Sequence, residues 1–181
     1  MSPRQRAEKI AVAIQGSEEI LPFTIRQSVM LGTYLHPENG EQITDDLLKK
    51  WDMSDWAERP FAALSGGEQQ KVKILRVLAQ NTPYILLDEP AASLDLSAQL
   101  DLYGKLQQLA REENKCVIMV SHDLYMAPNF TETMLLLKSG RLLASGRSED
   151  EAMSVAVSTA FETAVSICRS QDQLQICWQK K

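Results

Sequence analysis

The sequence predicts an α/β protein in which helices cover a mainly parallel sheet. Short apolar runs alternate with longer helical patterns along most of the chain, as with the run 84–87 between helical patterns at 65–80 and 96–113. In addition, Asp88 and Glu89 directly follow the apolar run 84–87. Because α/β proteins place functional groups at the carboxyl ends of their strands, this pair marks a candidate site.

The start of the predicted helix 65–80 is a candidate anion site. Leu64, Ser65, Gly66, Gly67 and Glu68 form its first turn and the residue before it. The first backbone N–H groups of a helix have no partner inside the helix and lie at its positive end. A phosphate is therefore the expected ligand of this turn.

Composition limits the classes of protein that remain open. With 181 residues and 44% apolar residues, the chain can bury one good core. Its net charge of −5 argues against nucleic-acid binding, which favours a basic face. No apolar run approaches the roughly 20 residues that span a bilayer, and no signal peptide is recognisable.

The cysteines give no sign of a metal site or a disulfide framework. They are odd in number and widely spaced, and two of them stand in apolar strand patterns. We therefore expect buried thiols in a reducing compartment. The three are Cys116, Cys168 and Cys177.

The first third of the chain predicts one strand and a helical insert. The run 10–14 is a buried strand, and Thr24 is the expected N-cap of a helix that reaches about residue 33. Thr44 is the expected cap of a second helix. The block 23–64 is thus a small helical subdomain. Its large apolar residues form either core or a docking surface, namely Trp51, Met53 and Trp56.

The remainder alternates between helix and strand. A long amphipathic helix, a strand and a short helix are followed by an antiparallel hairpin with a Ser-Gly turn. The tail predicts two short helices and then two strands. In order, these elements are 96–113, 116–120, a helix to about 129, 133–138, 141–144, 149–153, 157–161, 164–168 and 173–178.

The two adjacent carboxylates suit two different tasks. Asp88 can hold Mg²⁺ directly or through water, since this small hard cation prefers oxygen ligands. Glu89 can orient an attacking water or take its proton. Successive residues of a strand point to opposite faces, which supports separate roles for the pair.

Four motifs together resemble the ATPase domain of the ABC family, which has a P-loop NTPase-like fold. They are LSGGE at 64–68, ILLDEP at 85–90, SLD at 93–95 and VSHDL at 120–124, in the order and at about the spacing of that family. The alternative is a Rossmann-like domain in which the glycines and acids coincide by chance. The combination of four motifs favours the ABC resemblance over this alternative.

The resemblance implies roles for further residues. Gln15, at the end of the first strand, matches a glutamine that contacts Mg²⁺ and the attacking water. His122 matches a histidine that contacts the γ-phosphate, and Asp95 matches a residue near the phosphate site of the partner subunit. Residues 64–68 would bind nucleotide held by a second subunit. ATP and Mg²⁺ are the implied cofactors.

The resemblance is greatest to importers of iron-siderophores, haem and vitamin B12. It implies a partial ABC ATPase domain at 1–148 and a short C-terminal extension at 149–181. The implied partners are a second ABC ATPase subunit, joined head to tail, and a transmembrane permease that docks on 23–64. No nucleic acid is expected. The implied location is cytoplasmic, at the inner face of the cell membrane through the permease.

One departure from the family pattern is large. The phosphate-binding P-loop, GxxxxGK[ST], does not occur. The only Gly-Lys pair, Gly104-Lys105, has Gln99 where the first glycine belongs and is followed by Leu106. We therefore expect the chain to begin after the P-loop, through an internal gene start, an engineered cut or a natural loss. A gap in the sheet and an exposed edge would follow.

Three functions are compatible with these observations. The first is the ATP-hydrolysing subunit of an importer, present as a P-loop-less fragment that is inactive alone. The second is an ATP-independent binding or regulatory protein that docks a permease or an intact ABC ATPase. The third is an ABC protein of DNA repair or translation. The acidic composition and the absence of a second cassette disfavour the third.

Overall fold

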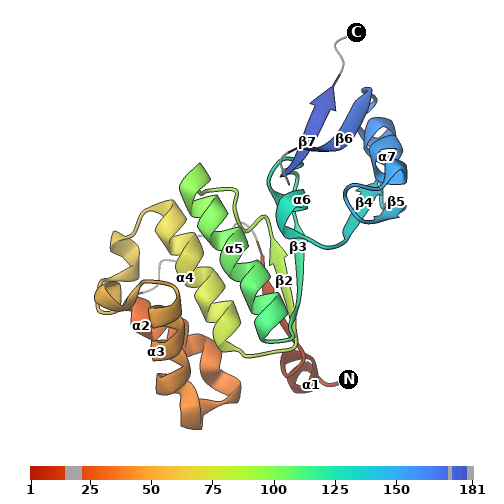
Figure 1. Cartoon of the computed structure of the whole chain (residues 1–181). Coiled ribbons are helices and arrows are strands. Elements are labelled where there is room, and N and C mark those ends of the chain that lie inside the picture. The colour runs from red at the N-terminus through yellow and green to blue at the C-terminus, as the bar shows by residue number, and fades with distance from the viewer. Residues whose placement is uncertain (15–21, 171–172, 179–181) are drawn as a thin grey trace. The chain divides into compact units, whose positions relative to one another are not determined.

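The computed structural model describes residues 1–14, 22–170 and 173–178 (Figure 1). Gln15 lies outside the described residues. The chain forms two compact units, Met1–Ser121 and His122–Lys181. The sequence also suggests a boundary after residue 148, between an ATPase domain and a C-terminal extension. That boundary stays a prediction.

A parallel sheet organises the first unit. Its strands are β1 (Ile10–Ala13), β2 (Tyr84–Asp88) and β3 (Cys116–Val120), in the order β1-β2-β3. Ala13 pairs with Leu87, and Asp88 pairs with Val120, so the three strands end at one edge. The predicted mixed α/β class with a parallel core sheet is confirmed.

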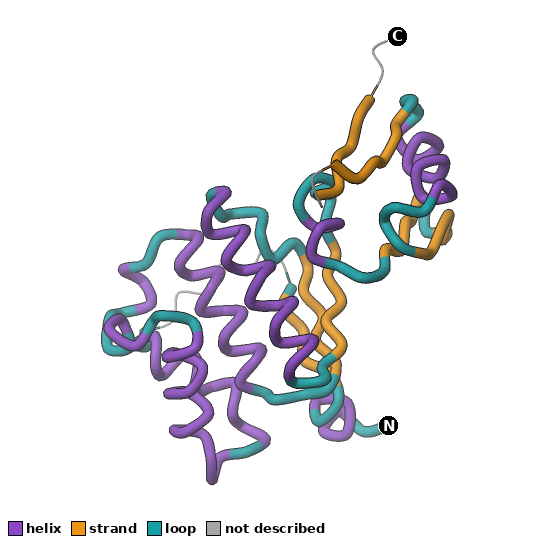
Figure 2. The backbone as a smooth tube through the Cα atoms, viewed as in Figure 1, coloured by secondary structure: helices purple, strands orange, loops and turns teal. Residues whose placement is uncertain are grey.

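Two helices pack on one face of this sheet (Figures 1 and 2). They are α4 (Gly66–Ala79) and α5 (Leu96–Glu112), and both are amphipathic as predicted. Below them Ile85 and Leu87 of β2 are buried. The buried side chains of the two helices are Val72, Ile74, Leu75, Leu78 and Ala79 in α4, and Leu102, Tyr103, Leu106 and Leu109 in α5.

The opposite side of the sheet carries apolar side chains that no described helix of the first unit covers. Alternate residues of each strand share this face, because parallel partners in register point the same way. We call it the open face. Its members are Ile10, Val12, Tyr84, Leu86, Cys116, Ile118 and Val120.

The predicted helical subdomain packs against α4. Apart from α1 (Pro3–Ala7), the helices before α4 are α2 (Ile25–Met30), α3 (Gly40–Lys50) and the 3-10 turns Leu31–Leu35, Pro37–Asn39, Ser54–Trp56 and Phe61–Ala63. Thr24 caps α2 as predicted, its side chain accepting a hydrogen bond from the Gln27 N–H.

The expectation that Thr44 caps a helix is wrong. Thr44 lies buried inside α3, one turn after the helix begins at Gly40. Its hydroxyl donates to the carbonyl oxygen of Gly40 at 2.7 Å. A threonine can satisfy its hydroxyl within its own helix in this way, so the residue type alone did not fix the helix start.

Burial distinguishes, in part, between the two roles expected for Trp51, Met53 and Trp56, namely core packing and a docking surface. Trp51 and Met53 are buried and belong to the core. Lys105 of α5 lies 5.5 Å from the centre of the Trp51 ring, and its amine donates to Asp52 at 2.9 Å. Trp56 is half-buried. Core packing therefore describes Trp51 and Met53.

The second unit contains two antiparallel hairpins and a helix. These are α6 (Ala127–Phe130), β4 (Met134–Lys138), β5 (Arg141–Gly146), α7 (Glu151–Phe161), β6 (Val165–Ser170) and β7 (Gln173–Trp178). The predicted hairpin at 133–144 is confirmed, and among the described residues it forms a two-stranded sheet of its own.

The two short helices expected in the tail are one helix. No proline or glycine interrupts residues 151–161, and α7 continues through them until Glu162 adopts a left-handed conformation. The buried residues of α7 are Met153, Ala156 and Val157. The sequence pattern indicated a break after Met153, but Ser154 continues the helix.

The expectation of buried thiols is wrong for two cysteines. Cys116 and Cys177 are both exposed. Cys116 lies on the open face, and Cys177 lies in the two-stranded sheet β6–β7 on the opposite face from the buried Leu174. An apolar strand buries its side chains only on faces that another element covers. The side chain of Cys168 is not among those described.

A glycine pair provides a test of the packing between α4 and the turn 31–35. A Cβ atom on Gly32 would lie 1.9 Å from the carbonyl oxygen of Arg76, whereas a Cβ on Gly104 would meet nothing within 4 Å. We expect Gly32→Ala to lower the free energy of unfolding by about 1–3 kcal/mol, through overpacking. Gly104→Ala, inside α5, is expected to raise it by about 0.5–1 kcal/mol.

Urea unfolding of both variants and the parent, followed by circular dichroism, measures these changes. Gly104→Ala serves as the control for glycine replacement as such. An unchanged midpoint for Gly32→Ala would contradict the close approach of the two backbones.

Candidate functional site

The turn that opens α4 is built as a capping box. The hydroxyl of Ser65 accepts from the Glu68 N–H at 3.4 Å, and the Glu68 carboxylate accepts from the Ser65 N–H at 2.7 Å. These bonds lower the pKa of the Glu68 carboxyl, the one from the Ser65 backbone N–H contributing most. Leu64, just before the turn, is buried and anchors it to the core.

The two glycines of this turn have different surroundings. A Cβ on Gly66 would meet nothing within 4 Å, so the backbone there is open to a ligand. A Cβ on Gly67 would lie 3.2 Å from both the Ser93 carbonyl oxygen and a Leu94 methyl group. The structure thereby brings the LSGGE turn and the SLD loop into contact. Sequence reasoning missed this contact, for which the second glycine was the available signal.

Asp95 has a structural role in the described residues. It is the N-cap of α5, and its carboxylate accepts from the Ala98 N–H at 2.8 Å. The Gln99 side-chain amide donates to the Leu94 carbonyl oxygen at 3.1 Å and so holds the same loop. The loop that contacts the LSGGE turn is therefore fixed by the start of a long helix.

Asp88 and Glu89 end the central strand of the sheet. Asp88 is half-buried, and its place in β2 puts it on the same side as Tyr84 and Leu86 of the open face. Glu89 adopts a left-handed backbone conformation with φ of 47°, while its N–H donates to the Val120 carbonyl oxygen at 2.9 Å. This conformation is costly for a residue with a Cβ and is concentrated at functional sites.

The remaining predicted residues are placed only in part. β1 ends at Ala13, shortly before Gln15, which is outside the described residues. His122 is exposed and is the first residue of the second unit, following β3 and Ser121. The described structure therefore brings predicted site residues together in two places. The LSGGE turn contacts the SLD loop, and Glu89 bonds to the end of β3.

Asp88 and Glu89 are the side chains of the candidate site that could hold a metal ion. Within the described part of the chain, no three His, Cys, Asp or Glu side chains converge on a point where they could hold one. The Asp88–Glu89 pair nevertheless fits Mg²⁺, because this ion keeps several waters and binds one or two carboxylates together with substrate phosphates. The residues present suit an ion that arrives with a nucleotide.

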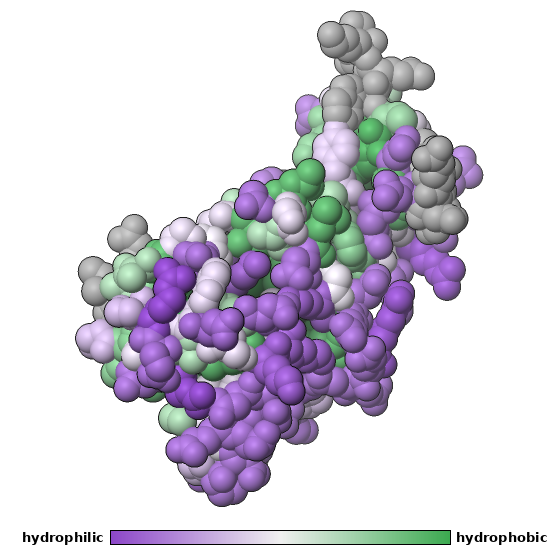
Figure 3. Space-filling view, turned by 60° about the vertical axis from the view of Figure 1, so that its left-hand side comes forward, coloured by the Kyte–Doolittle hydropathy of each residue, from purple (hydrophilic) through white to green (hydrophobic). Residues whose placement is uncertain are grey.

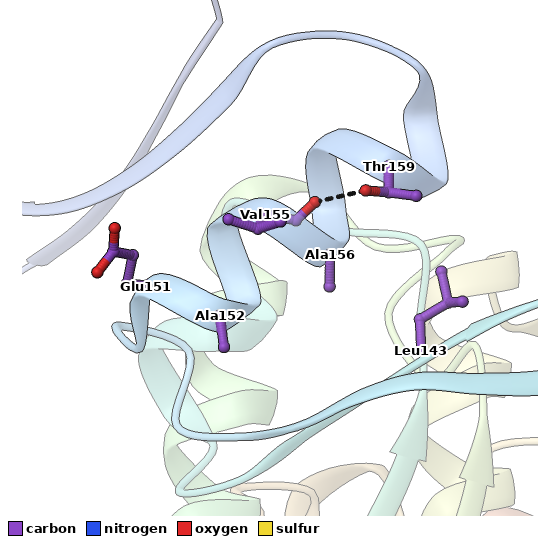
Figure 4. Close-up of a pocket in the computed structure, with 6 residues that line it drawn as sticks. All are labelled: Leu143, Glu151, Ala152, Val155, Ala156 and Thr159. Atoms are coloured by element: carbon purple, nitrogen blue, oxygen red, sulfur yellow. Dashed lines mark hydrogen bonds between the residues drawn. The ribbon is translucent and has the colours of Figure 1, made fainter.

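The pocket shown in Figure 4 lies elsewhere. It is an open hollow of about 470 Å³ in the second unit, between α7 and Leu143 of β5. None of its lining residues belongs to the predicted site, and its walls are mainly short apolar side chains. The Thr159 hydroxyl donates to the Val155 carbonyl oxygen at 2.9 Å, inside the helix (Figure 4).

The parallel sheet, the carboxylates at the end of its central strand and the capped glycine turn define an α/β protein with a candidate site at the carboxyl ends of its strands. The sequence profile described as "ABC transporter" matches residues 2–92. The chain belongs to the ABC transporter family.

Curated relatives include import proteins from several organisms. The chain is 35% identical over 153 residues to the iron(3+)-hydroxamate import ATP-binding protein of Bacillus subtilis (strain 168), covering 81% of this chain and 57% of that protein. It is 34% identical over 179 residues to the hemin import ATP-binding protein of Rhizobium etli, covering 92% and 67%. The chain thus spans between about half and two thirds of these relatives.

Solved structures share the fold. The dimeric post-hydrolysis state of the ATP-binding cassette MJ0796, bound to ADP and Pi, matches with a TM-score of 0.70 and 28% identity, over 81% of this chain and 68% of that one. The ADP conformation of the cassette MJ1267 matches with a TM-score of 0.74 and 21% identity, over 90% and 70%. Among the residues described here, no helix combines the length and apolar character needed to cross a membrane.

The capping box predicts a specific acid sensitivity. Because the pKa of Glu68 is lowered in the folded chain, its stabilising contribution is complete above the carboxyl's ordinary pKa near 4.5 and is lost as the pH falls through the lowered value. We expect Glu68→Gln to show a smaller loss of stability than the parent between about pH 6 and pH 3. Urea midpoints measured across this range test the difference.

Glu38→Gln is the matched control, since Glu38 is an exposed carboxyl of the same unit. Its pH dependence should follow that of the parent. Parallel curves for the parent and Glu68→Gln would show that the capping carboxylate has no such role.

Proposed function

We propose that this chain supplies the signature turn and the carboxylate pair of an ATP-hydrolysing subunit of an ABC importer. The observation that carries the proposal is the end of β2, where Asp88 and Glu89 follow the central strand and Glu89 holds a strained backbone conformation. The contact between the LSGGE turn and the SLD loop adds a second ordered motif.

The cargo class follows from the relatives' names. These proteins are described as import ATP-binding proteins for iron(3+)-hydroxamate, hemin and, in Halobacterium salinarum, cobalamin. All three cargoes are metal chelates. An importer of an iron-siderophore, haem or vitamin B12 is therefore the proposed setting of this chain.

The chemistry is assigned to the chain's own residues. Asp88 would hold Mg²⁺ together with nucleotide phosphates, and Glu89 would orient the attacking water and accept its proton. Gln15 and His122 are proposed to contact the water and the γ-phosphate. The role of Mg²⁺, when bound, is to neutralise phosphate charge.

The signature turn is proposed to act on a second subunit. The N–H groups of Gly66 and Gly67 lie at the positive end of the fourteen-residue helix α4 and are suited to a phosphate. With Leu64, Ser65, Glu68 and Asp95, they would face ATP held by a second ABC ATPase subunit in a head-to-tail dimer. The permease would dock on residues 23–64, which places the assembly at the cytoplasmic face of the membrane.

A second candidate function rests on the missing phosphate loop. The chain contains no GxxxxGK[ST] sequence, so its own residues lack the usual cradle for a nucleotide. An ATP-independent binding or regulatory protein, which docks a permease or an intact ABC ATPase, would need only the surfaces that remain.

The first test is ATP hydrolysis by the purified chain. We expect no phosphate release above that of a protein-free blank with Mg²⁺ and ATP, because the chain has no P-loop. A coupled phosphate assay measures the rate, with Glu89→Gln as the control for contamination. Steady release that Glu89→Gln abolishes would contradict the proposed inactivity of the isolated chain.

The second test is stimulation of an intact partner. The Bacillus subtilis relative, purified separately, is expected to hydrolyse ATP faster when this chain is added in excess. Ser65→Arg should return the rate to that of the relative alone. The long side chain would block the approach of a phosphate to the first N–H groups of α4, and the serine cap of the helix would be lost.

Ser2→Arg is the matched control, since Ser2 caps α1 through the same kind of capping box. It should leave the stimulation intact. Equal stimulation by the parent and Ser65→Arg would count against a role for the signature turn.

A further inference from the structure

We infer that Asn129 is a positioning residue for His122, because its side chain fixes the segment after His122 to the C-terminal hairpin formed by β6 and β7. We call residues 122–130 the histidine segment. His122 contacts the γ-phosphate in the proposed function, on which this inference rests. The link itself lies within the second unit and requires neither ATP nor Mg²⁺.

The histidine segment has little regular structure of its own. It consists of turns and the four-residue helix α6, which is too short to be stable by itself. The Asp123 carboxylate organises its first part by accepting from the Tyr125 N–H at 2.8 Å and the Met126 N–H at 2.9 Å. Bonds to other elements are therefore needed to fix the segment in place.

Asn129 supplies such bonds to strand β7. Its side-chain oxygen accepts from the Leu174 N–H at 2.6 Å, and its side-chain NH₂ group donates to the Leu174 carbonyl oxygen at 3.2 Å. The same NH₂ group donates to the Tyr125 carbonyl oxygen at 2.8 Å, inside the histidine segment. One amide thus joins the turn that follows His122 to a residue 45 positions further along the chain than Asn129.

This pairing reproduces the bonds of a neighbouring strand. In an antiparallel pair, a residue directs both its N–H and its C=O either toward the partner strand or away from it. Leu174 faces away from β6, since both of its backbone groups bond to Asn129. The asparagine amide therefore occupies one position on the outer edge of β7.

The outer edge of β6 is held in a similar manner by α7. The Val165 N–H donates to the Ser158 hydroxyl at 2.9 Å, and the Ile167 N–H donates to the Ser154 hydroxyl at 3.0 Å. Both outer edges of the hairpin thus bond to side chains of other elements. The hairpin thereby connects α7 with the histidine segment.

Many apolar side chains of the second unit are exposed, so hydrogen bonds carry more of its order. The exposed fractions are 57% for Leu135, 63% for Leu137 and 57% for Leu142. Figure 3 shows hydrophobic residues at the surface of one side of the molecule, among hydrophilic ones. A segment with few buried apolar contacts opens easily unless its polar groups are held. The bonds of Asn129 are therefore expected to decide how well the histidine segment is ordered.

The experiment changes the link from each of its two ends. Asn129→Ala removes the amide, and Leu174→Pro removes the N–H that donates to it while remaining compatible with an outer strand. Ile176→Pro is the matched control, because Ile176 lies two residues further along the same edge of β7. Each variant is made in the full chain and studied without nucleotide or Mg²⁺.

Amide hydrogen exchange measures the order of the histidine segment. We expect Asn129→Ala and Leu174→Pro each to speed exchange of the Tyr125 and Met126 N–H groups at least about fivefold, as the loss of such hydrogen bonds requires. Because both changes break one link, the double variant should exchange no faster than Asn129→Ala alone. Ile176→Pro should leave these rates close to those of the parent.

The imidazole of His122 gives a readout that a link confined to α6 would not move. The chain has two histidines, and His36 in the first unit is the internal reference in the same NMR spectrum. We expect the His122 Cε1–H signal to shift in Asn129→Ala and in Leu174→Pro, with the His36 signal unchanged. Ile176→Pro should leave both signals in place.

Protection of the Val165 and Ile167 N–H groups, which bond to α7, shows that each variant retains the hairpin. If Leu174→Pro loses this protection, Asn129→Ala decides the outcome by itself.

Unchanged exchange at Tyr125 and Met126 in Asn129→Ala would overturn the inference, as would additive effects in the double variant. Faster exchange with an unmoved His122 signal would also overturn it, because the link would then hold α6 alone. Since no nucleotide is present, failure here is distinct from failure of the proposed ATPase role.

Discussion

The pairing of β2 between β1 and β3 is the constraint on which the first unit depends. The strand buries Ile85 and Leu87 under α4 and α5, and its end fixes Asp88 and Glu89. The hydrogen bond from the Glu89 N–H to β3 holds the turn that follows. A single strand therefore connects the core, which supplies most of the stabilisation, with the carboxylates of the candidate site.

The helix starts of the candidate site and the turn after β2 are stabilised by different means. Ser65 and Glu68 satisfy one another at the start of α4, and Asp95 satisfies the start of α5. These groups stabilise helices whether or not a ligand is present. Glu89, in contrast, keeps a left-handed backbone that local sequence does not favour. The cost of this conformation is about 1–2 kcal/mol.

The two faces of the sheet differ in the exposure of their apolar side chains. On the helical side, Ala11, Ile85 and Leu87 are buried, as is usual in an α/β protein. On the open face the apolar side chains are largely exposed, and Asp88 lies at the end of the same side. The exposed apolar surface of the sheet therefore extends to Asp88.

The sequence alone predicted the α/β class, the helices at α4 and α5, the hairpins and the motif residues, because periodicity and capping chemistry are local. It misplaced the start of α3, since Thr44 could bond within its helix, and it divided α7 in two. Only the tertiary structure decided which apolar residues are buried, why Cys116 is exposed and why Gly67 contacts the SLD loop. Burial and contact depend on which element covers each face, and that is a property of the packed chain rather than of any segment.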